Sequence, residues 1–516
     1  MARITCFDGV GCIGGNKILL EDGEARLFLD FGRNFGLEGA YYEEFLQPKN
    51  CAGLYEYVRM GLLPPIRDIY RDDLSWDDAD PWEGIEAREI GGVGGVLVSH
   101  AHLDHLGAVH HLRADIPIYC SPMTAAIARA LQDTGSSSRP QDYCYYVERE
   151  SEPGHGLKSP SKNAKGRVRQ YCLSDPASDG LTALWRTSPW KNRELDPADF
   201  RSADECAGRR IRRFAVDHSV FGASAWAVET DSGWVVYGGD LRLHGGYGHL
   251  TRAFAEQAAA LEPAALIIEG TRIESSSATT EADVADTCAK AVKECDGLVV
   301  ADFGPRNVER LLSFKQIAVE TGRKLAILPR DAYLLHTMRL ADGEQEVPAI
   351  EPSWARIYYE YSADRRSVWQ SVVFDTYPHL VVRPTEVAAN QTDFICCLSF
   401  FDVNELAYVR PAPESLWIYS SCEAFDEEMA ISAERLQHWL DRFGMQRRGR
   451  LRQDEQESDP FHVSGHASGP DLVELVRTIR PKMLIPVHTQ HPEAYAEQVR
   501  DVCDVRIPER GVSIEL

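Results

Sequence analysis

The feature that most constrains the fold of this chain is the segment GGVLVSHAHLDHLGAV, in which three imidazoles and one carboxylate directly follow an apolar run. The apolar run is typical of a buried strand. Core packing gives no reason for the polar groups, since each costs free energy when it is buried without a partner. Imidazole nitrogen and carboxylate oxygen are common ligands of zinc and related divalent ions. The segment therefore predicts a metal site at a strand end, formed by His100, His102, Asp104 and His105.

Composition limits the class of protein without deciding its function. The 516 residues suffice for two to four domains, and no stretch has the apolar length of a signal peptide or a membrane span. Thirteen cysteines without CxxC spacing are typical of reduced thiols, so we expect a cytoplasmic protein. A net charge of −24 counts against a polyanionic partner, although two basic clusters, RRIRRF and RRGRLR, interrupt the acidity. Each cluster is either a solvated face or a local substrate contact.

The order of apolar and polar runs predicts α/β layers. NKILLEDGEARLFLDFG is typical of a hairpin whose second strand ends at Asp30, and further strands are expected in GGVGGVLVSH, IPIYCS, RRFAVDHSV, SAWAVET, GWVVYGGD and PAALIIEGTR. The irregular segment from residue 33 to about 82 is expected to cover one face of this domain. Residues 133–204 are polar and rich in Ser, Pro, Lys and Arg, which predicts a flap and not a core element.

A second α/β run begins near residue 275. GLVVADF, KLAILP and LWIYSS are its expected strands, and no cluster of metal-type histidines falls within it. The last part of the chain returns to strand, helix and strand and carries two more histidines of interest. We therefore predict an inserted domain at 275–445, with the first domain formed by residues 1–274 and 446–516.

The His-x-His-x-Asp-His motif after an apolar strand resembles the metallo-β-lactamase superfamily, an αββα sandwich with its metals at one edge of the sheets. Three later residues match the superfamily's motifs in order, namely His218 in VDHSVFG, Asp240 in VVYGGDLRLH and His488 in LIPVHTQ. The resemblance implies two divalent ions, one held by His100, His102 and His218 and the other by Asp104, His105 and His488, with Asp240 between them. It also implies that Asp30 in LFLDFG supports the site from behind the ligands.

The match is closer to one family within the superfamily. The chain resembles the β-CASP nucleases, which include RNase J and the RNA-cleaving subunit of the polyadenylation machinery. The resemblance lies in the inserted domain and in three residues with their motifs, namely Glu269 in IIEGTR, His466 in HVSGHAS and His488 in PKMLIPVH. The resemblance implies an αββα metallo-β-lactamase sandwich with an inserted α/β β-CASP domain. It also implies RNA as the substrate, cut as an endonuclease or a 5′-exonuclease, with DNA as the weaker alternative.

The residue types fit this chemistry. Two divalent ions about 3.5–4 Å apart stabilise the attacking and the leaving oxygen of an in-line phosphoryl displacement. The ligand set contains no thiolate, which favours zinc, with manganese as the alternative. His466 is not needed as a ligand, and a partner carboxylate such as Glu269 would raise its pKa and let it protonate the departing 3′-oxygen. We therefore expect Asp104, Glu269 and His466 to act in catalysis.

The turn around His466 is a candidate substrate contact. His462, Val463, Ser464, Gly465 and His466 are predicted to cradle a phosphate with backbone N–H and hydroxyl donors, and the alternative is a strand that simply ends in a glycine turn. His110 and His111 are expected on a helix surface, and the role of His244 is open.

The chain also departs from the family pattern. YSSCEAFDEEM stands where RNase J relatives carry a glycine-rich phosphate-contacting loop. It keeps Ser420 and Ser421 but adds four acids, namely Glu423, Asp426, Glu427 and Glu428, which counts against a 5′-exonuclease mode. The chain ends soon after the last motif, so the long C-terminal dimerisation domain of RNase J is expected to be absent, and a homo-oligomer is left open.

Three functions remain after the sequence is considered. The first is metal-dependent hydrolysis of RNA. The second is hydrolysis of a small molecule on the same metal site, as by a lactonase, a thioesterase or a cyclic-nucleotide phosphodiesterase, which suits the acidic charge. The third is a non-catalytic role in a nuclease complex. The complete ligand set counts against the third, and the inserted domain and His466 count against the second.

Overall fold

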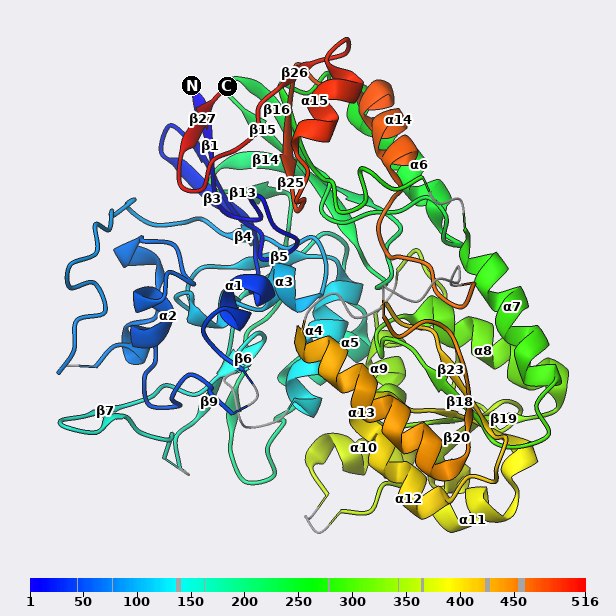
Figure 1. Ribbon diagram of the computed structural model, residues 1–516. Helices are drawn as coiled ribbons and strands as arrows, with labels where there is room; N and C mark the ends of the chain where they lie inside the picture. The colour runs from blue at the N-terminus through cyan, green and yellow to red at the C-terminus, as the bar shows by residue number, and fades with distance from the viewer. Residues whose placement is uncertain are drawn as a thin grey trace.

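The computed structural model describes residues 1–516 except 44, 77, 136–140, 162, 277–278, 342, 363–365, 423–426 and 453–459. Two mixed sheets pack face to face at the top of the molecule, and a third sheet lies below them (Figure 1). Among the described residues, no helix has the length and the apolar character that crossing a bilayer requires.

The first sheet has the strand order β12-β10-β5-β4-β3-β2-β1-β27. Its strands are β1 (Ala2–Asp8), β2 (Lys17–Asp22), β3 (Ala25–Phe31), β4 (Val96–Leu97), β5 (Ile118–Cys120), β10 (Tyr171–Leu173), β12 (Arg201–Ser202) and β27 (Ser513–Glu515). The predicted hairpin is confirmed, since β2 and β3 pair antiparallel around the turn at Gly23. The two ends of the chain meet in this sheet, where β1 pairs with β27.

The second sheet has the order β13-β14-β15-β16-β17-β25-β26. Its strands are β13 (Glu205–Cys206), β14 (Arg209–Ala215), β15 (Ser224–Thr230), β16 (Gly233–Tyr237), β17 (Ala265–Glu269), β25 (Met483–Val487) and β26 (Asp504–Val505). The side chains of β15 contact two different layers, because neighbouring side chains on a strand point to opposite faces of the sheet. Trp226 and Val228 pack into the core between the two sheets, whereas Ala225 and Ala227 pack against the outer helices.

Helices cover the outer faces of both sheets, so the predicted αββα sandwich is confirmed. Leu472 and Val476 of α14 (Gly469–Ile479) share a core with Phe254 of α6 (Gly248–Ala259) on the second sheet. The helix α15 (Glu493–Val499) completes this layer. The first sheet is covered by α4 (Pro122–Thr134) and by the segment from residue 33 to 82, which contains α1 (Phe35–Gly39) and α2 (Tyr55–Arg59).

The third sheet is parallel throughout and has the order β21-β20-β19-β22-β18-β23-β24. Its strands are β18 (Val299–Asp302), β19 (Lys324–Ile327), β20 (Ala355–Tyr358), β21 (Val381–Val382), β22 (Phe394–Cys397), β23 (Leu416–Tyr419) and β24 (Gln446–Arg448). Its helices are α7 (Glu281–Lys293), α8 (Val308–Thr321), α9 (Pro329–Met338), α10 (Val368–Thr376), α11 (Pro384–Ala389), α12 (Leu406–Val409) and α13 (Glu427–Phe443). We call this sheet and these helices the inserted lobe.

The chain then returns to the sandwich. Strand β25 lies parallel to β17, with Ala265 opposite Met483 and Glu269 opposite Val487. Figure 1 shows this return as the orange chain that leaves the inserted lobe and reaches α14 and β25 at the top. The strands of the inserted lobe run from residue 299 to 448, and the domain boundaries at 274 and 445 stay a prediction.

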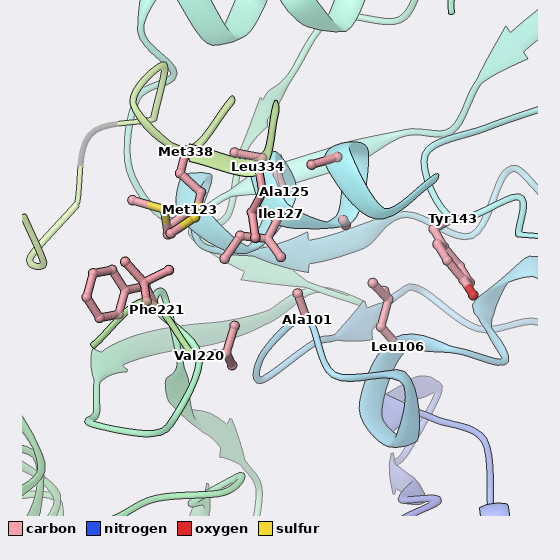
Figure 2. Packing of buried hydrophobic residues seen from close by; sticks show 14 of the residues in the cluster. Ala101, Leu106, Met123, Ala125, Ile127, Tyr143, Val220, Phe221, Leu334 and Met338 are labelled. Atoms are coloured by element: carbon pink, nitrogen blue, oxygen red, sulfur yellow. The ribbon is translucent and has the colours of Figure 1, made fainter. Parts of the chain in front are cut away.

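A joint of apolar side chains connects the inserted lobe to the sandwich. Met123 and Ile127 of α4 point towards Leu334 and Met338 of α9, all of them buried (Figure 2). The loop that carries Val220 and Phe221 lies next to them in the same cluster. This loop directly follows His218, so the joint also fixes the position of a predicted metal ligand.

The prediction of a flap at residues 133–204 is wrong in part. Strand β10 pairs with β5 inside the first sheet, and its three residues are buried. The short strands β6 (Tyr145–Tyr146), β9 (Gly166–Val168) and β11 (Leu195–Asp196) form a small sheet, and β7 (Ser151–Glu152) pairs with β8 (Gly156–Leu157). The helix α5 (Asp179–Arg186) buries Trp185. Strands of two or three residues leave no period in a sequence, which is why the polar composition misled the prediction.

We expect Trp185→Ala to destabilise the protein by about 3–5 kcal/mol, because it removes a large buried ring. Trp185 is 1% exposed and its ring lies 4.8 Å from those of Tyr171 and Phe200, measured between centroids. The midpoint of denaturant unfolding measures the effect. Lys191→Ala, an exposed change in the same segment, is the matched control and should shift stability by less than about 0.5 kcal/mol. Equal midpoints for both variants would show that this segment is no part of the core.

Candidate metal centre

The predicted ligands come from four separate segments that meet at one edge of the sandwich. His100 and His102 follow β4, and Asp104 and His105 lie in the single-turn helix α3 (Leu103–Leu106). His218, Asp240 and His488 follow β14, β16 and β25 in turn. The ligands thus sit in the turns and the short helix that follow the carboxyl ends of strands from both sheets.

The first group of ligand atoms is His100 Nε2, His102 Nδ1 and His218 Nε2. His102 Nδ1 lies 3.0 Å from His100 Nε2 and 3.2 Å from His218 Nε2. Burial and the neighbouring imidazoles hold the pKa values of His100 and His102 well below the usual value, and burial lowers that of His218 to about 3. All three rings are therefore neutral at physiological pH, as ligation of a metal requires.

The second group contains Asp104, His105, His488 and Asp240, whose ligand atoms also lie within reach of one common point. His488 Nε2 is 3.3 Å from Asp104 Oδ2, and His105 Nε2 is 3.1 Å from Asp240 Oδ2. Asp240 Oδ2 is also 3.8 Å from His100 Nε2 and 3.9 Å from His218 Nε2. One carboxylate thus lies between the two groups, as a ligand shared by two ions would.

The ligand rings are oriented by hydrogen bonds on their other nitrogens. His100 Nδ1 bonds Ser99 Oγ at 2.9 Å, and His218 Nδ1 donates to the carbonyl of Gly465 at 2.7 Å. His488 Nδ1 bonds Thr271 Oγ1 at 2.8 Å. Such partners fix the tautomer of a ligating imidazole and leave its opposite nitrogen free to bind metal.

Asp30 lies behind the ligands and holds several groups at once. Its carboxylate accepts hydrogen bonds from the Ser99 amide at 2.6 Å, the Ser99 hydroxyl at 2.7 Å, the Tyr237 hydroxyl at 2.6 Å and His105 Nδ1 at 2.7 Å. Asp30 and His488 both have left-handed backbones, with φ of 57° and 52°. This conformation is uncommon outside glycine and is found disproportionately at functional sites.

We expect Asp30→Asn to weaken metal binding by about 10–100-fold, the usual effect of removing a partner that orients a ligand. In asparagine one carboxylate oxygen is replaced by an NH₂ group, which donates and cannot accept, so the remaining oxygen cannot satisfy all four donors that Asp30 now accepts from. Competition with a chromophoric chelator measures the affinity. Asp231→Asn, an exposed carboxylate paired with Arg209, is the control and should bind metal as the wild type does. An unchanged affinity in Asp30→Asn would rule out this role for Asp30.

The residues fit a pair of divalent ions. Two of the buried polar atoms, His105 Nε2 and Asp240 Oδ1, make no hydrogen bond within the part of the chain that the structure describes, although each is a ligand-type atom in the second group. Neutral imidazoles and carboxylates are a donor set for zinc, manganese and similar ions. The structure therefore brings all seven predicted ligands together, and their role as ligands stays a prediction.

His466 and Glu269 form a pair beside Asp240. His466 Nδ1 lies 3.0 and 2.9 Å from the two oxygens of Glu269 and 3.9 Å from Asp240 Oδ2. Glu269 is fully buried and accepts hydrogen bonds from the amides of Leu241 and Thr271. Burial lowers the pKa of His466, but the charges of Glu269 and Asp240 outweigh it and raise that pKa to about 9. His466 thus carries a proton at neutral pH.

The predicted substrate turn uses its carbonyl groups to hold histidines. The carbonyl of Gly465 accepts from His218, and that of Ser464 accepts from His244 Nε2 at 2.7 Å. The Ser464 hydroxyl accepts from the amide of His466 at 3.2 Å, so this amide is not free for a phosphate. A Cβ on Gly465 would lie 2.7 Å from Ser219 Oγ, which explains the glycine. The structure therefore supports a role of this turn in positioning His218 and His244. Phosphate contacts by His462, Val463 and Ser464 stay a prediction.

A buried network of ion pairs and hydrogen bonds connects the sandwich, next to the turn around His466, to the inserted lobe. Glu281, at the start of α7, accepts from Arg242 at 2.9 Å and from Arg310 of α8 at 2.8 Å. Arg310 also donates to the carbonyls of Ser420 and Phe461. Ser420 is therefore part of the network, whereas Glu423 and Asp426 lie outside the described residues, as does the side chain of Glu427.

The expected exposure of His110 and His111 is wrong. They are 4% and 3% exposed, because the turn that carries them lies under the segment from residue 33 to 82. His111 packs against the ring of Tyr57 at 4.5 Å between centroids. Sequence reasoning also missed Ser99, Tyr237 and Thr271, the partners that orient the site. Only their places next to predicted strand ends could have indicated them.

Comparisons with known proteins agree with this arrangement. Residues 75–149 match the beta-lactamase superfamily domain, and residues 459–502 match the Zn-dependent metallo-hydrolase RNA specificity domain. Ribonuclease J of Helicobacter pylori is 21% identical over 99% of this chain and 59% of its own length. Ribonuclease J of Mycolicibacterium smegmatis is 22% identical over 100% of this chain and 74% of its own. The chain thus spans about three fifths of the H. pylori relative.

A solved structure shares the fold. The crystal structure of a protein of unknown function from Enterococcus faecalis V583 matches with a TM-score of 0.67 and 21% identity, and the match covers 100% of both chains. The arrangement of the sandwich and the inserted lobe is therefore that of a known fold.

Proposed function

We propose that this chain, a member of the RNase J-like β-CASP group of the metallo-β-lactamase superfamily, hydrolyses the phosphodiester bonds of RNA with the help of two divalent ions. The membership expected from the motifs is confirmed by the two domain matches and by the similarity along the whole chain. The observation that carries the proposed activity is the His466–Glu269 pair beside a shared carboxylate, Asp240.

The seven ligands would hold the ions in two groups that share Asp240. Ions bound there would acidify a water molecule and neutralise the charge of a phosphate group. Zinc is the favoured metal, with manganese as the alternative, because every ligand atom is nitrogen or oxygen. The protein's own contribution is to keep His100, His102 and His218 neutral. It also orients the rings of His100 and His218 by their hydrogen bonds to Ser99 and Gly465.

His466 is suited to protonate the leaving group. Its Nδ1 is held by Glu269, and its Nε2 makes no hydrogen bond to any residue that the structure describes. The side chain is 19% exposed, so solvent reaches the ring. A protonated ring in this position can donate to a departing 3′-oxygen, while Glu269 stabilises the imidazolium before transfer and orients it.

The choice of RNA rests on two lines of support. The relatives similar along the whole chain are named Ribonuclease J, and residues 459–502 match a domain described as conferring RNA specificity on zinc-dependent hydrolases. His466 lies inside this second match. A thioester releases a thiolate, which leaves without being protonated, so the His466–Glu269 pair does not favour such a substrate.

A substrate panel tests the proposal. Protein stripped with a chelator and reloaded with Zn²⁺ or Mn²⁺ is incubated with 5′-labelled single-stranded RNA, DNA of the same sequence, and a neutral lactone. We expect cleavage of RNA to be fastest, with product lengths that separate internal cuts from stepwise removal at the 5′ end. Asp240→Asn protein, purified in parallel, controls for contaminating nuclease. Faster turnover of the lactone than of either nucleic acid would contradict the proposal.

A further inference from the structure

The side chain of Arg242 joins the sandwich to the inserted lobe at a buried point. It is fully buried and pairs with three carboxylates, namely Asp217 of the sandwich at 3.3 Å, Glu281 of α7 at 2.9 Å, and Glu309 of α8. The two glutamates belong to the inserted lobe, whereas Arg242 lies two residues after the predicted ligand Asp240. Two helices of the inserted lobe thus hold one guanidinium that belongs to a ligand-bearing turn.

Asp217 extends this contact to a second ligand-bearing turn. It directly precedes the predicted ligand His218, and its carbonyl accepts a hydrogen bond from the Arg242 amide at 2.8 Å, so the two turns are also joined through the backbone. On the other side of His218, Val220 and Phe221 pack into the apolar joint with α4 and α9 (Figure 2). The segment that carries His218 is therefore connected to the inserted lobe on both sides.

Stability alone gives no reason for the network around Arg242. It contains two guanidiniums and three carboxylates, since Arg310 of α8 also pairs with Glu281 at 2.8 Å. Burying such charges costs a desolvation free energy that their attraction roughly offsets, and apolar side chains of similar volume are often equally stable or more stable. Ion pairs and hydrogen bonds do, however, set the distances and angles between their members within narrow limits. The network therefore supplies a fixed geometry between the inserted lobe and the two turns.

We propose that Arg242 is a positioning residue, through which the inserted lobe holds the turns of His218 and Asp240 in the arrangement that binds metal. This inference rests on the proposed function, because it gives the lobe a part in building the metal centre. His218 belongs to the first group of ligand atoms and Asp240 lies between the two groups, so a shift of these turns would separate the ligand atoms of both. Glu309 of the lobe thereby acts on metal affinity through Arg242.

Metal affinity tests the assignment without relying on turnover. Protein freed of metal is titrated with Zn²⁺ in competition with a chromophoric chelator. Glu309→Gln keeps the volume of the side chain and one acceptor oxygen but removes the charge that pairs with Arg242, and it should weaken Zn²⁺ binding by about 10-fold. Arg242→Lys keeps the positive charge but loses the planar fork that contacts three carboxylates, so it should weaken binding at least as much.

The matched control is Glu320→Gln, which makes the same change at an exposed position of the same helix and should bind Zn²⁺ as the wild type does. Denaturant midpoints show whether each variant is folded. The Glu309 side chain is 12% exposed, so Glu309→Gln decides alone if Arg242→Lys fails to fold. If both variants fold, the double variant should bind more tightly than the sum of the two losses predicts, since either change breaks the same contact.

Wild-type affinity in folded Glu309→Gln would overturn the inference, as would an equal loss in Glu320→Gln. Full additivity of the Glu309 and Arg242 changes would overturn it too, because the two side chains would then act independently. In each of these cases the wild type still binds Zn²⁺ and cuts RNA. Wild-type protein that neither binds Zn²⁺ nor cuts RNA would refute the proposed function itself, and the inference with it.

Discussion

Replacing Asp240 with alanine is expected to remove metal from both ligand groups and to abolish RNA cleavage, with a loss of about 10⁴-fold or more. Asp240 Oδ2 lies 3.1 Å from His105 Nε2 and 3.8 Å from His100 Nε2, so one carboxylate serves both groups. Without bound ions, the nucleophile would be ordinary water, whose pKa lies far above the ~7 reached on a catalytic metal. Elemental analysis after gentle dialysis measures the metal, and cleavage of labelled RNA measures the activity.

The matched comparison is His102→Ala, which removes a ligand of the first group alone. We expect this variant to keep a larger share of its metal than Asp240→Ala, because the second group is left intact. Circular dichroism of both proteins controls for folding. If His102→Ala lost more metal than Asp240→Ala, Asp240 could not be the ligand that the two ions share.

Replacing His466 with alanine is expected to lower the rate on RNA by about 10²–10⁴-fold while metal content stays near that of the wild type. The physical reason is the leaving group. An RNA 3′-oxygen leaves poorly unless it is protonated, whereas p-nitrophenolate leaves without help. The variant should therefore be far less impaired on bis(p-nitrophenyl) phosphate than on RNA.

Glu269→Gln should change the rate in the same direction but by less, because Glu269 orients His466 and does not reach the substrate. The Glu269 carboxylate contacts His466 Nδ1 at 2.9 Å, and its charge is the main influence that raises the pKa of this histidine. The pH profile should respond as well, with the descending limb of the RNA reaction moved to lower pH. Metal loss in His466→Ala, or equal losses on both substrates, would make His466 a ligand or a scaffold residue.

The metal centre was largely predictable because its ligands lie at strand ends with strong apolar patterns. A buried strand followed by a polar residue is predicted by each of the segments VLVSH, VVYGGD and LIPVH. Neighbouring strands in a sheet bring such strand ends to one edge. The same logic located Asp30 at the end of β3 and Glu269 at the end of β17.

The sequence could not predict features that depend on tertiary contacts between segments without a regular pattern of apolar residues. Trp185 and β10 lie in a stretch whose polar composition concealed them, and His111 is buried by a segment that carries no regular pattern. The hydrogen bond from His218 to Gly465 joins residues 247 apart in the chain.

A metal titration of single-turnover RNA cleavage tests the two-metal reaction most directly. Protein freed of metal with a chelator is mixed with 5′-labelled single-stranded RNA and with rising equivalents of Zn²⁺ or Mn²⁺, and the first-order rate of cleavage is recorded at each point. The two ligand groups that share Asp240 predict no cleavage without metal and a rate that saturates at two equivalents per chain. Cleavage that persists after chelation, or no cleavage once two equivalents are bound, would contradict the two-metal reaction.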